Sequence, residues 1–287
     1  MKYGPDYTTM ETKTTTTLGR KTMATMRIKD PHLGTWMAPD PMCEKYYDLS
    51  PYAYCAGDPV NFVDPLGLKI RGVTKEDVQE FQEDINTVLA DEKFADIRSL
   101  FVIKGKTFNR IDEQDLETAK NKISLTDDEN AYISMLATAI NSKKVYTVEY
   151  VDGEFVSSKG ASAIVNYFNE SFGEGVGDSI TKPSGDVSSS LISHSGGGLN
   201  VPTANGSHSF IIKGFPSKDR AVTSGHEVLG HGIPSAKGLS NAENNSNAIR
   251  AENLIRRILK LPSNDGSTHG GYQSGQIVNP FGMPLLK

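Results

Sequence analysis

The most informative segment of the chain reads Gly225-His226-Glu227-Val228-Leu229-Gly230-His231-Gly232. Zinc-binding helices usually carry the pattern H-E-x-x-H, because residues i and i+4 lie on one helix face. Here the histidines are five residues apart, which at ~100° per residue places the second about 140° away from the first. We therefore expect a π-bulge that absorbs the extra residue and returns both rings to one face. Gly230 would tolerate this distortion because it has no Cβ.

A catalytic zinc site has three protein ligands and one water, so a third ligand is needed. Glu252 falls on the apolar stripe of the next predicted helix, about residues 242–260, and follows His231 by 21 residues. A carboxylate in that position is costly unless it is paired or bound to a metal. Two alternatives remain open. His226 could be an ordinary core histidine, and Glu252 could form an i, i+4 ion pair with Arg256.

The segment 226–231 resembles the H-E-x-x-G-H helix of dipeptidyl peptidase III. Arg250-Ala251-Glu252 is similar to the R-A-E tripeptide that carries the third ligand in that family. The spacing of the ligands resembles thermolysin-like gluzincins more closely. The resemblance implies a zincin-like α+β fold in which the general base is Glu227 and the zinc ligands are His226, His231 and Glu252.

Peptide hydrolysis at such a site also needs a group that stabilises the oxyanion. His269 and Tyr272 are candidates, because they lie in the glycine-flanked segment 265–272. His208 is a third candidate, on a predicted strand at 208–215. We expect this strand to be the edge strand that holds an extended substrate by β-augmentation. Each histidine could instead be an ordinary exposed loop or strand residue.

Residues 30–68 contain six prolines and show neither a helical nor a strand period. Asp-Pro pairs begin at Asp30, Asp40, Asp58 and Asp64, and an aspartate before a proline favours turns and extended backbone. We therefore predict a chain of turns that lies on another surface.

This segment resembles the Rhs-associated core of Rhs and YD-repeat proteins. The matching stretches are Asp30–Trp36, Pro39-Asp40-Pro41, Ser50-Pro51-Tyr52 and Asn61–Leu68. The resemblance implies a β-shell upstream, a variable toxin domain downstream and a cognate immunity protein. It also implies that Asp64 could serve in self-cleavage after Leu68. Lys69-Ile70-Arg71 replaces the usual small residues there, so plain turn structure is the alternative.

The composition divides the chain and excludes several classes of protein. Residues 1–29 form a polar, threonine-rich leader that we expect to be disordered, and residues 69–287 form the effector domain, with the zinc site within 205–287. The net charge is -5, and residues 151–287 hold 11 basic and 11 acidic side chains, so no nucleic-acid partner is expected. Two cysteines, Cys43 and Cys55, are too few for a disulfide framework or a thiolate zinc site.

No apolar run approaches the ~20 residues of a membrane span, and the N-terminal segment has no signal-peptide h-region. The protein therefore either stays inside the cell or leaves it by a route that ignores N-terminal signals. The resemblance to Rhs proteins implies the second: a secreted effector that leaves by a signal-peptide-independent route and is cytoplasmic in the producer before export.

The hydrophobic period predicts the elements of the effector domain. Thr74 and Thr126 are predicted to cap helices, and residues 170–206 are expected to form a long loop or short strands. The remaining predictions are a hairpin at 100–108, strands at 145–151 and 208–215, and helices at about 161–168, 219–231 and 242–260.

The sequence thus predicts the C-terminal effector of an Rhs-type polymorphic toxin, acting as a zinc-dependent metallopeptidase on a protein or peptide. One alternative is a toxin nuclease. Another is a non-enzymatic module whose zinc site is structural or vestigial.

Overall fold

The computed structural model describes residues 69–267, 269 and 277–285. The leader at 1–29, the Rhs-like segment with Asp64 and both cysteines, and Tyr272 lie outside these residues. The described part combines helices with a mixed sheet, so it has the predicted α+β composition.

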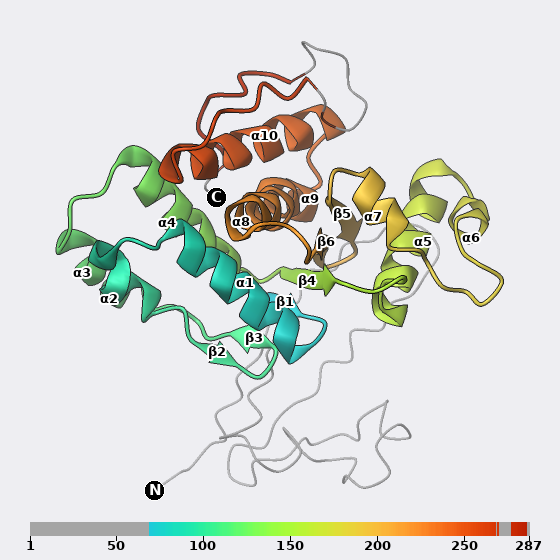
Figure 1. The fold of residues 1–287 in the computed structure, drawn as a ribbon, viewed down its shortest axis with the longest axis horizontal. Coiled ribbons are helices and arrows are strands. Elements are labelled where there is room, and N and C mark those ends of the chain that lie inside the picture. Colours follow the sequence, from blue (N-terminus) through green and yellow to red (C-terminus); the bar gives the residue numbers. More distant parts are fainter. Residues whose placement is uncertain (1–68, 268, 270–276, 286–287) are drawn as a thin grey trace, which may run out of the picture. The chain divides into compact units, whose positions relative to one another are not determined.

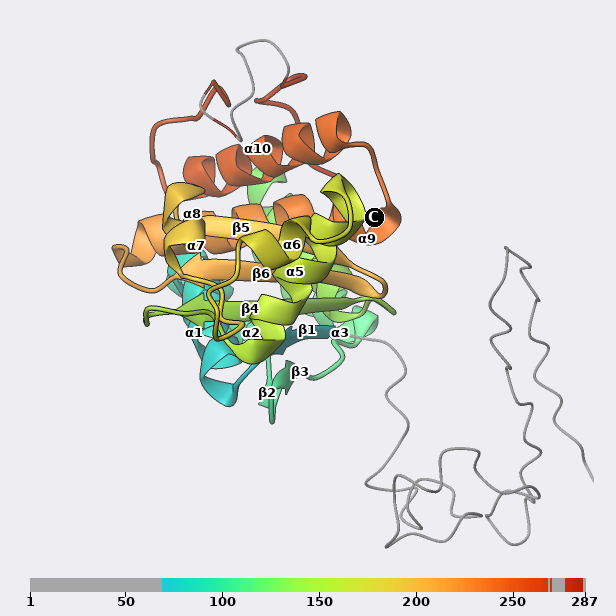
Figure 2. The same ribbon diagram turned by 90° about the vertical axis from the view of Figure 1, so that its right-hand side faces the viewer.

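The described strands form one six-stranded sheet in the order β2-β3-β1-β4-β6-β5. Its centre consists of three parallel strands, β1 (Lys69–Gly72), β4 (Val145–Val151) and β6 (Gly206–Ile212). Antiparallel strands flank this centre, with the hairpin of β2 (Ile103–Lys104) and β3 (Thr107–Phe108) at one end and β5 (Gly198–Thr203) at the other. Figure 2 shows β5 as the strand at the upper end of this stack. The predicted strand at 208–215 is therefore an interior strand, and β5 takes the edge position.

One face of the sheet is covered by α1 (Lys75–Val88) and α4 (Asp127–Ile140), which share a core with Tyr146 and Val148 of β4. Both helices begin at the predicted threonines, where Thr74 and Thr126 each form a capping box with the residue three positions on. The connection between them contains η3 (Glu92–Phe94), α2 (Ala95–Arg98) and α3 (Glu113–Asn121).

The opposite face carries α5 (Ser158–Phe172), α6 (Val176–Ser179) and α7 (Ser190–His194). Val151 of β4 and Phe210 of β6 point into this second apolar cluster with Ile164 of α5. Because side chains alternate along a strand, neighbouring positions of β4 and β6 serve the two faces in turn. The predicted loop at 170–206 thus contains the end of α5, the two short helices α6 and α7, and the whole of the edge strand β5.

A third group of helices carries the candidate site. A continuous helical segment runs through α8 (Ser217–Gly225), η4 (His226–His231) and α9 (Gly232–Lys237), and α10 (Asn241–Ile258) packs across it (Figure 1). Among the residues that the structure describes, no helix combines the length and the hydropathy needed to cross a membrane.

Candidate metal centre

The two histidines of the H-E-x-x-x-H segment lie together because the segment is a π-helix. All six residues from His226 to His231 have this conformation, and the N–H of Gly232 donates to the carbonyl of Glu227, five residues back. The extra residue per turn brings the rings to a centroid separation of 4.9 Å. The predicted π-bulge is confirmed.

Gly230 has a packing role in addition to the expected backbone freedom. A Cβ at this position would lie 2.8 Å from the Cα of Ala248 and 3.2 Å from the Cβ of Ala251. The side chain of Asn247 donates to the carbonyl of Gly230 at 2.7 Å. The absence of a side chain therefore lets α10 approach η4 closely, and α10 in turn satisfies a carbonyl of the π-helix.

A third histidine completes the group. His269, in the segment after α10, has its ring centroid 4.9 Å from that of His226 and 5.1 Å from that of His231. One possible ligand atom from each of the three side chains lies within 4.8 Å of the others, so these histidines could hold a metal ion. His269 was expected to stabilise an oxyanion, but the structure places it among the candidate ligands instead.

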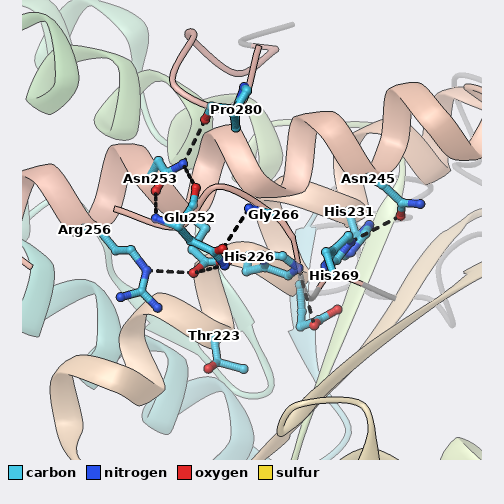
Figure 3. A network of polar contacts seen from close by, with 12 residues as sticks. Thr223, His226, His231, Asn245, Glu252, Asn253, Arg256, Gly266, His269 and Pro280 are labelled. Atoms are coloured by element: carbon cyan, nitrogen blue, oxygen red, sulfur yellow. Dashed lines mark hydrogen bonds and ion pairs between the residues drawn. The ribbon is translucent and has the colours of Figure 1, made fainter. Parts of the chain in front are cut away.

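Glu252 does not occupy the predicted position of third ligand. Figure 3 shows His226 between Glu252 on one side and the other two histidines on the other. One carboxylate oxygen of Glu252 lies 2.9 Å from Nδ1 of His226, and the other accepts from Arg256 and Asn264 at 2.7 and 3.0 Å. The ion pair with Arg256, which was the alternative to metal binding by Glu252, is therefore present, and Glu252 orients the His226 ring from behind.

The charge distribution follows from this pairing. Burial would raise the pKa of Glu252, but the hydrogen bond and charge of His226 outweigh it and lower the pKa to about 2. Burial would lower the pKa of His226, but Glu252 and Glu227 together raise it. Burial and the positive charge of His226 hold the pKa of His231 well below its usual range and lower that of His269 to about 4. His231 and His269 are thus neutral at pH 7, the state in which imidazole binds metals.

In each histidine of the π-helix, Nδ1 has a hydrogen-bond partner, and Nε2 has none among the described residues. Nδ1 of His226 contacts Glu252, and Nδ1 of His231 lies 2.6 Å from the side-chain oxygen of Asn244 on α10. Nε2 of both rings remains available to a metal. Sequence reasoning missed Asn244, although the asparagine-rich start of α10 was a visible signal that this helix supplies polar partners.

Glu227 lies beside this group. Its Oε1 is 4.0 Å from Nε2 of His226, and its Oε2 is buried without a hydrogen-bond partner in the described part of the chain. The first residue of β5 lies directly against the Glu227 side chain, since a Cβ added to Gly198 would be 2.5 Å from Oε1 of Glu227. Burial raises the pKa of Glu227 to about 7, against the lowering effect of His226. An unpaired carboxyl with this pKa is suited to take up and release a proton near neutral pH.

His208 does not belong to this site. It is buried on β6, with Nε2 3.0 Å from Glu149 of β4, and its ring stacks on Phe210 at 4.4 Å. Phe210 belongs to the apolar cluster on the α5 face of the sheet. Ser209, the next residue after His208 in β6, instead accepts a hydrogen bond from Asn200, which also donates to the backbone of η4. The structure therefore does not bring His208, a predicted oxyanion stabiliser, to the three histidines, because strand alternation turns it to the other face of the sheet.

No family model, curated protein or solved structure matches this chain. The interpretation of the site therefore depends on its geometry and on the chemistry of its residues.

Proposed function

We propose that this chain is the C-terminal effector of an Rhs-type toxin and acts as a zinc-dependent metallopeptidase. The observation that carries the proposal is the convergence of His226, His231 and His269 beside Glu227, whose buried Oε2 has no hydrogen-bond partner among the described residues. The combination of imidazole ligands with an adjacent proton acceptor is typical of hydrolytic zinc sites.

The donor set fits zinc. Three imidazoles are a common protein ligand set of catalytic zinc, which is usually four-coordinate. Within the described residues the group offers three side chains, which leaves a fourth position for water or substrate. Glu252 supports the site by accepting from Nδ1 of His226, an arrangement that fixes the ring and makes its other nitrogen a better donor.

Glu227 is the proposed general base. When bound, zinc would lower the pKa of a water molecule and polarise the scissile carbonyl. The carboxylate of Glu227 would accept the proton of this water and pass it to the leaving amine. Its buried Oε2 has no hydrogen-bond partner among the described residues, so within them no hydrogen bond has to be broken before it accepts this proton.

The substrate is proposed to be an extended segment of a protein. β5 is the outer strand of the described sheet, and its first residue, Gly198, lies against the carboxylate of Glu227. A strand added along this edge would carry a backbone carbonyl past the three histidines. The strand that carries His208 was expected to bind the extended substrate, and we assign this role to β5 instead.

The wider biology is proposed from the resemblance of residues 30–68 to the Rhs core. On this proposal the effector leaves its producer without a signal peptide, acts in a target cell and is neutralised by a cognate immunity protein. The balanced charge of residues 151–287 favours a protein substrate over the phosphate backbone that a nuclease toxin would bind. A structural zinc site would need a fourth protein ligand, and the described residues supply three histidines.

The test is expression of the full chain carrying Glu227→Gln, beside the wild type and the matched control Glu174→Gln on the exposed surface. We expect Glu227→Gln to retain zinc and to lose proteolysis and toxicity by about 10²–10⁴-fold, the usual contribution of a general base. The control should behave as wild type. A Glu227→Gln protein that keeps zinc and stays equally toxic would contradict the peptidase mechanism.

A further inference from the structure

A line of hydrogen bonds connects a candidate ligand to the edge of the sheet. Nδ1 of His231 lies 2.6 Å from Oδ1 of Asn244, whose Nδ2 donates to the hydroxyl of Ser235 on α9 at 2.9 Å. That hydroxyl donates to Oδ1 of Asn200 on β5 at 3.0 Å. Nδ2 of Asn200 in turn donates to the backbone carbonyl of Glu227 at 3.2 Å.

The carbonyl of Glu227 fixes the direction of every bond in this line. A carbonyl can only accept, so Asn200 presents its amide N–H to it and its oxygen to Ser235. Ser235 must then donate to that oxygen, and its own oxygen accepts from the amide of Asn244. The oxygen of Asn244 therefore faces His231, and Nδ1 of His231 must carry the proton.

We propose that Asn200, Ser235 and Asn244 are positioning residues that hold His231 as the Nδ1–H tautomer. In this tautomer Nε2 carries the lone pair that can bind a metal. Among the described residues, His231 has no carboxylate partner like the Glu252 of His226. We therefore infer that this line of neutral side chains orients His231 as the carboxylate orients His226. The consequence for metal binding rests on the proposed function, but the tautomer is a property of the protein alone.

The π-helix supplies the anchor of the line. The carbonyl of Glu227 accepts from the N–H of Gly232 and from Asn200, so both of its lone pairs are used. The same contact ties the backbone of the proposed general base to β5. Ring orientation at His231 and backbone position at Glu227 therefore depend on the same three side chains.

The experiment measures the ring nitrogens of His231 by ¹⁵N NMR in the zinc-free full chain, together with its affinity for Zn²⁺. Ser235→Ala removes the middle of the line, and Ser193→Ala, on the exposed side of α7, is the matched control. We expect a protonated Nδ1 in the wild type and the control. Ser235→Ala should give a mixture of tautomers and bind zinc about 10-fold more weakly, as for other residues that orient metal ligands.

The double variant Ser235→Ala/Asn244→Asp separates this role from simple packing. A carboxylate at position 244 can only accept, so it should restore the Nδ1–H tautomer without restoring the line. A wild-type His231 protonated on Nε2, or a tautomer unchanged in Ser235→Ala, would overturn the inference. An Nδ1–H tautomer in a protein that binds no zinc would support the inference and overturn the proposed function.

Discussion

Two buried histidine–glutamate pairs lie on opposite faces of the sheet and share the same chemistry at nearly the same distance. His226 contacts Glu252 at 2.9 Å, and His208 contacts Glu149 at 3.0 Å. At the first pair, the other ring nitrogen faces two further histidines and the carboxylate of Glu227. The first pair is therefore part of a site that is open to a ligand.

The second pair is closed. The ring of His208 lies flat on Phe210, and the oxygens of Glu149 also accept from the N–H and the hydroxyl of Ser157 at 2.6 and 2.9 Å. Ser157 is the N-cap of α5, so this carboxylate joins β4 and β6 to the start of a helix. The comparison shows that surroundings, rather than the pair itself, separate a candidate reactive site from a structural contact.

The largest expected effect comes from breaking the closed pair. Glu149→Ala would leave a buried histidine without its partner and remove an acceptor at the start of α5, so the free energy of unfolding should fall by about 3–5 kcal/mol. Zinc stoichiometry of the folded protein should stay unchanged. Chemical denaturation and metal analysis would check both statements, and a loss of zinc with normal stability would reverse the proposed roles of the two pairs.

A smaller effect on stability, but a large one on metal binding, is expected at the open site. His269→Ala should weaken zinc binding by more than about 100-fold, because a lost ligand costs more than a lost orienting residue. The metal-free protein should unfold at nearly the wild-type denaturant concentration. His194→Ala, on the exposed side of α7, is the control, and equal zinc affinity in both variants would remove His269 from the site.

The smallest effect is the response of the closed pair to acid. Burial raises the pKa of Glu149, but the hydrogen bonds of His208 and Ser157 outweigh it and hold this pKa below its ordinary value of 4.5. Because the folded-state pKa is lowered, the stabilisation is present above pH 4.5 and is lost as the pH falls below that value. The difference in unfolding free energy between metal-free wild type and Glu149→Gln should therefore shrink on acidification. A difference that stays constant from pH 7 to pH 3 would contradict this assignment.

Local signals in the sequence predicted much of the fold. The capping residues Thr74 and Thr126 and the apolar period located two helices, and the β-branched run at 145–151 gave a central strand with its observed bounds. The five-residue spacing of His226 and His231 predicted the π-helix, because only one conformation brings both rings together. These features depend on neighbouring residues alone.

The remainder depends on contacts that are distant in sequence. The sequence predicted Glu252 as third ligand and His269 as an oxyanion stabiliser, but the fold places the carboxylate behind His226 and the ring of His269 beside the other two histidines. His208 lies away from the three histidines because strand alternation turns it to the other face of the sheet, and the order of the strands makes β5, not the strand of His208, the outer strand. The short strand Lys69–Gly72 has too few residues to show a period, so its pairing with β4 decided its structure.

The most direct test of the central claim is a crystal structure of the zinc-loaded full chain. The account predicts one zinc ion with a ring nitrogen each from His226, His231 and His269 at about 2.0–2.1 Å, a water or substrate atom in the fourth position, and Glu252 still bonded to Nδ1 of His226. Zinc bound by an oxygen of Glu252, or closed by four protein ligands, would contradict it.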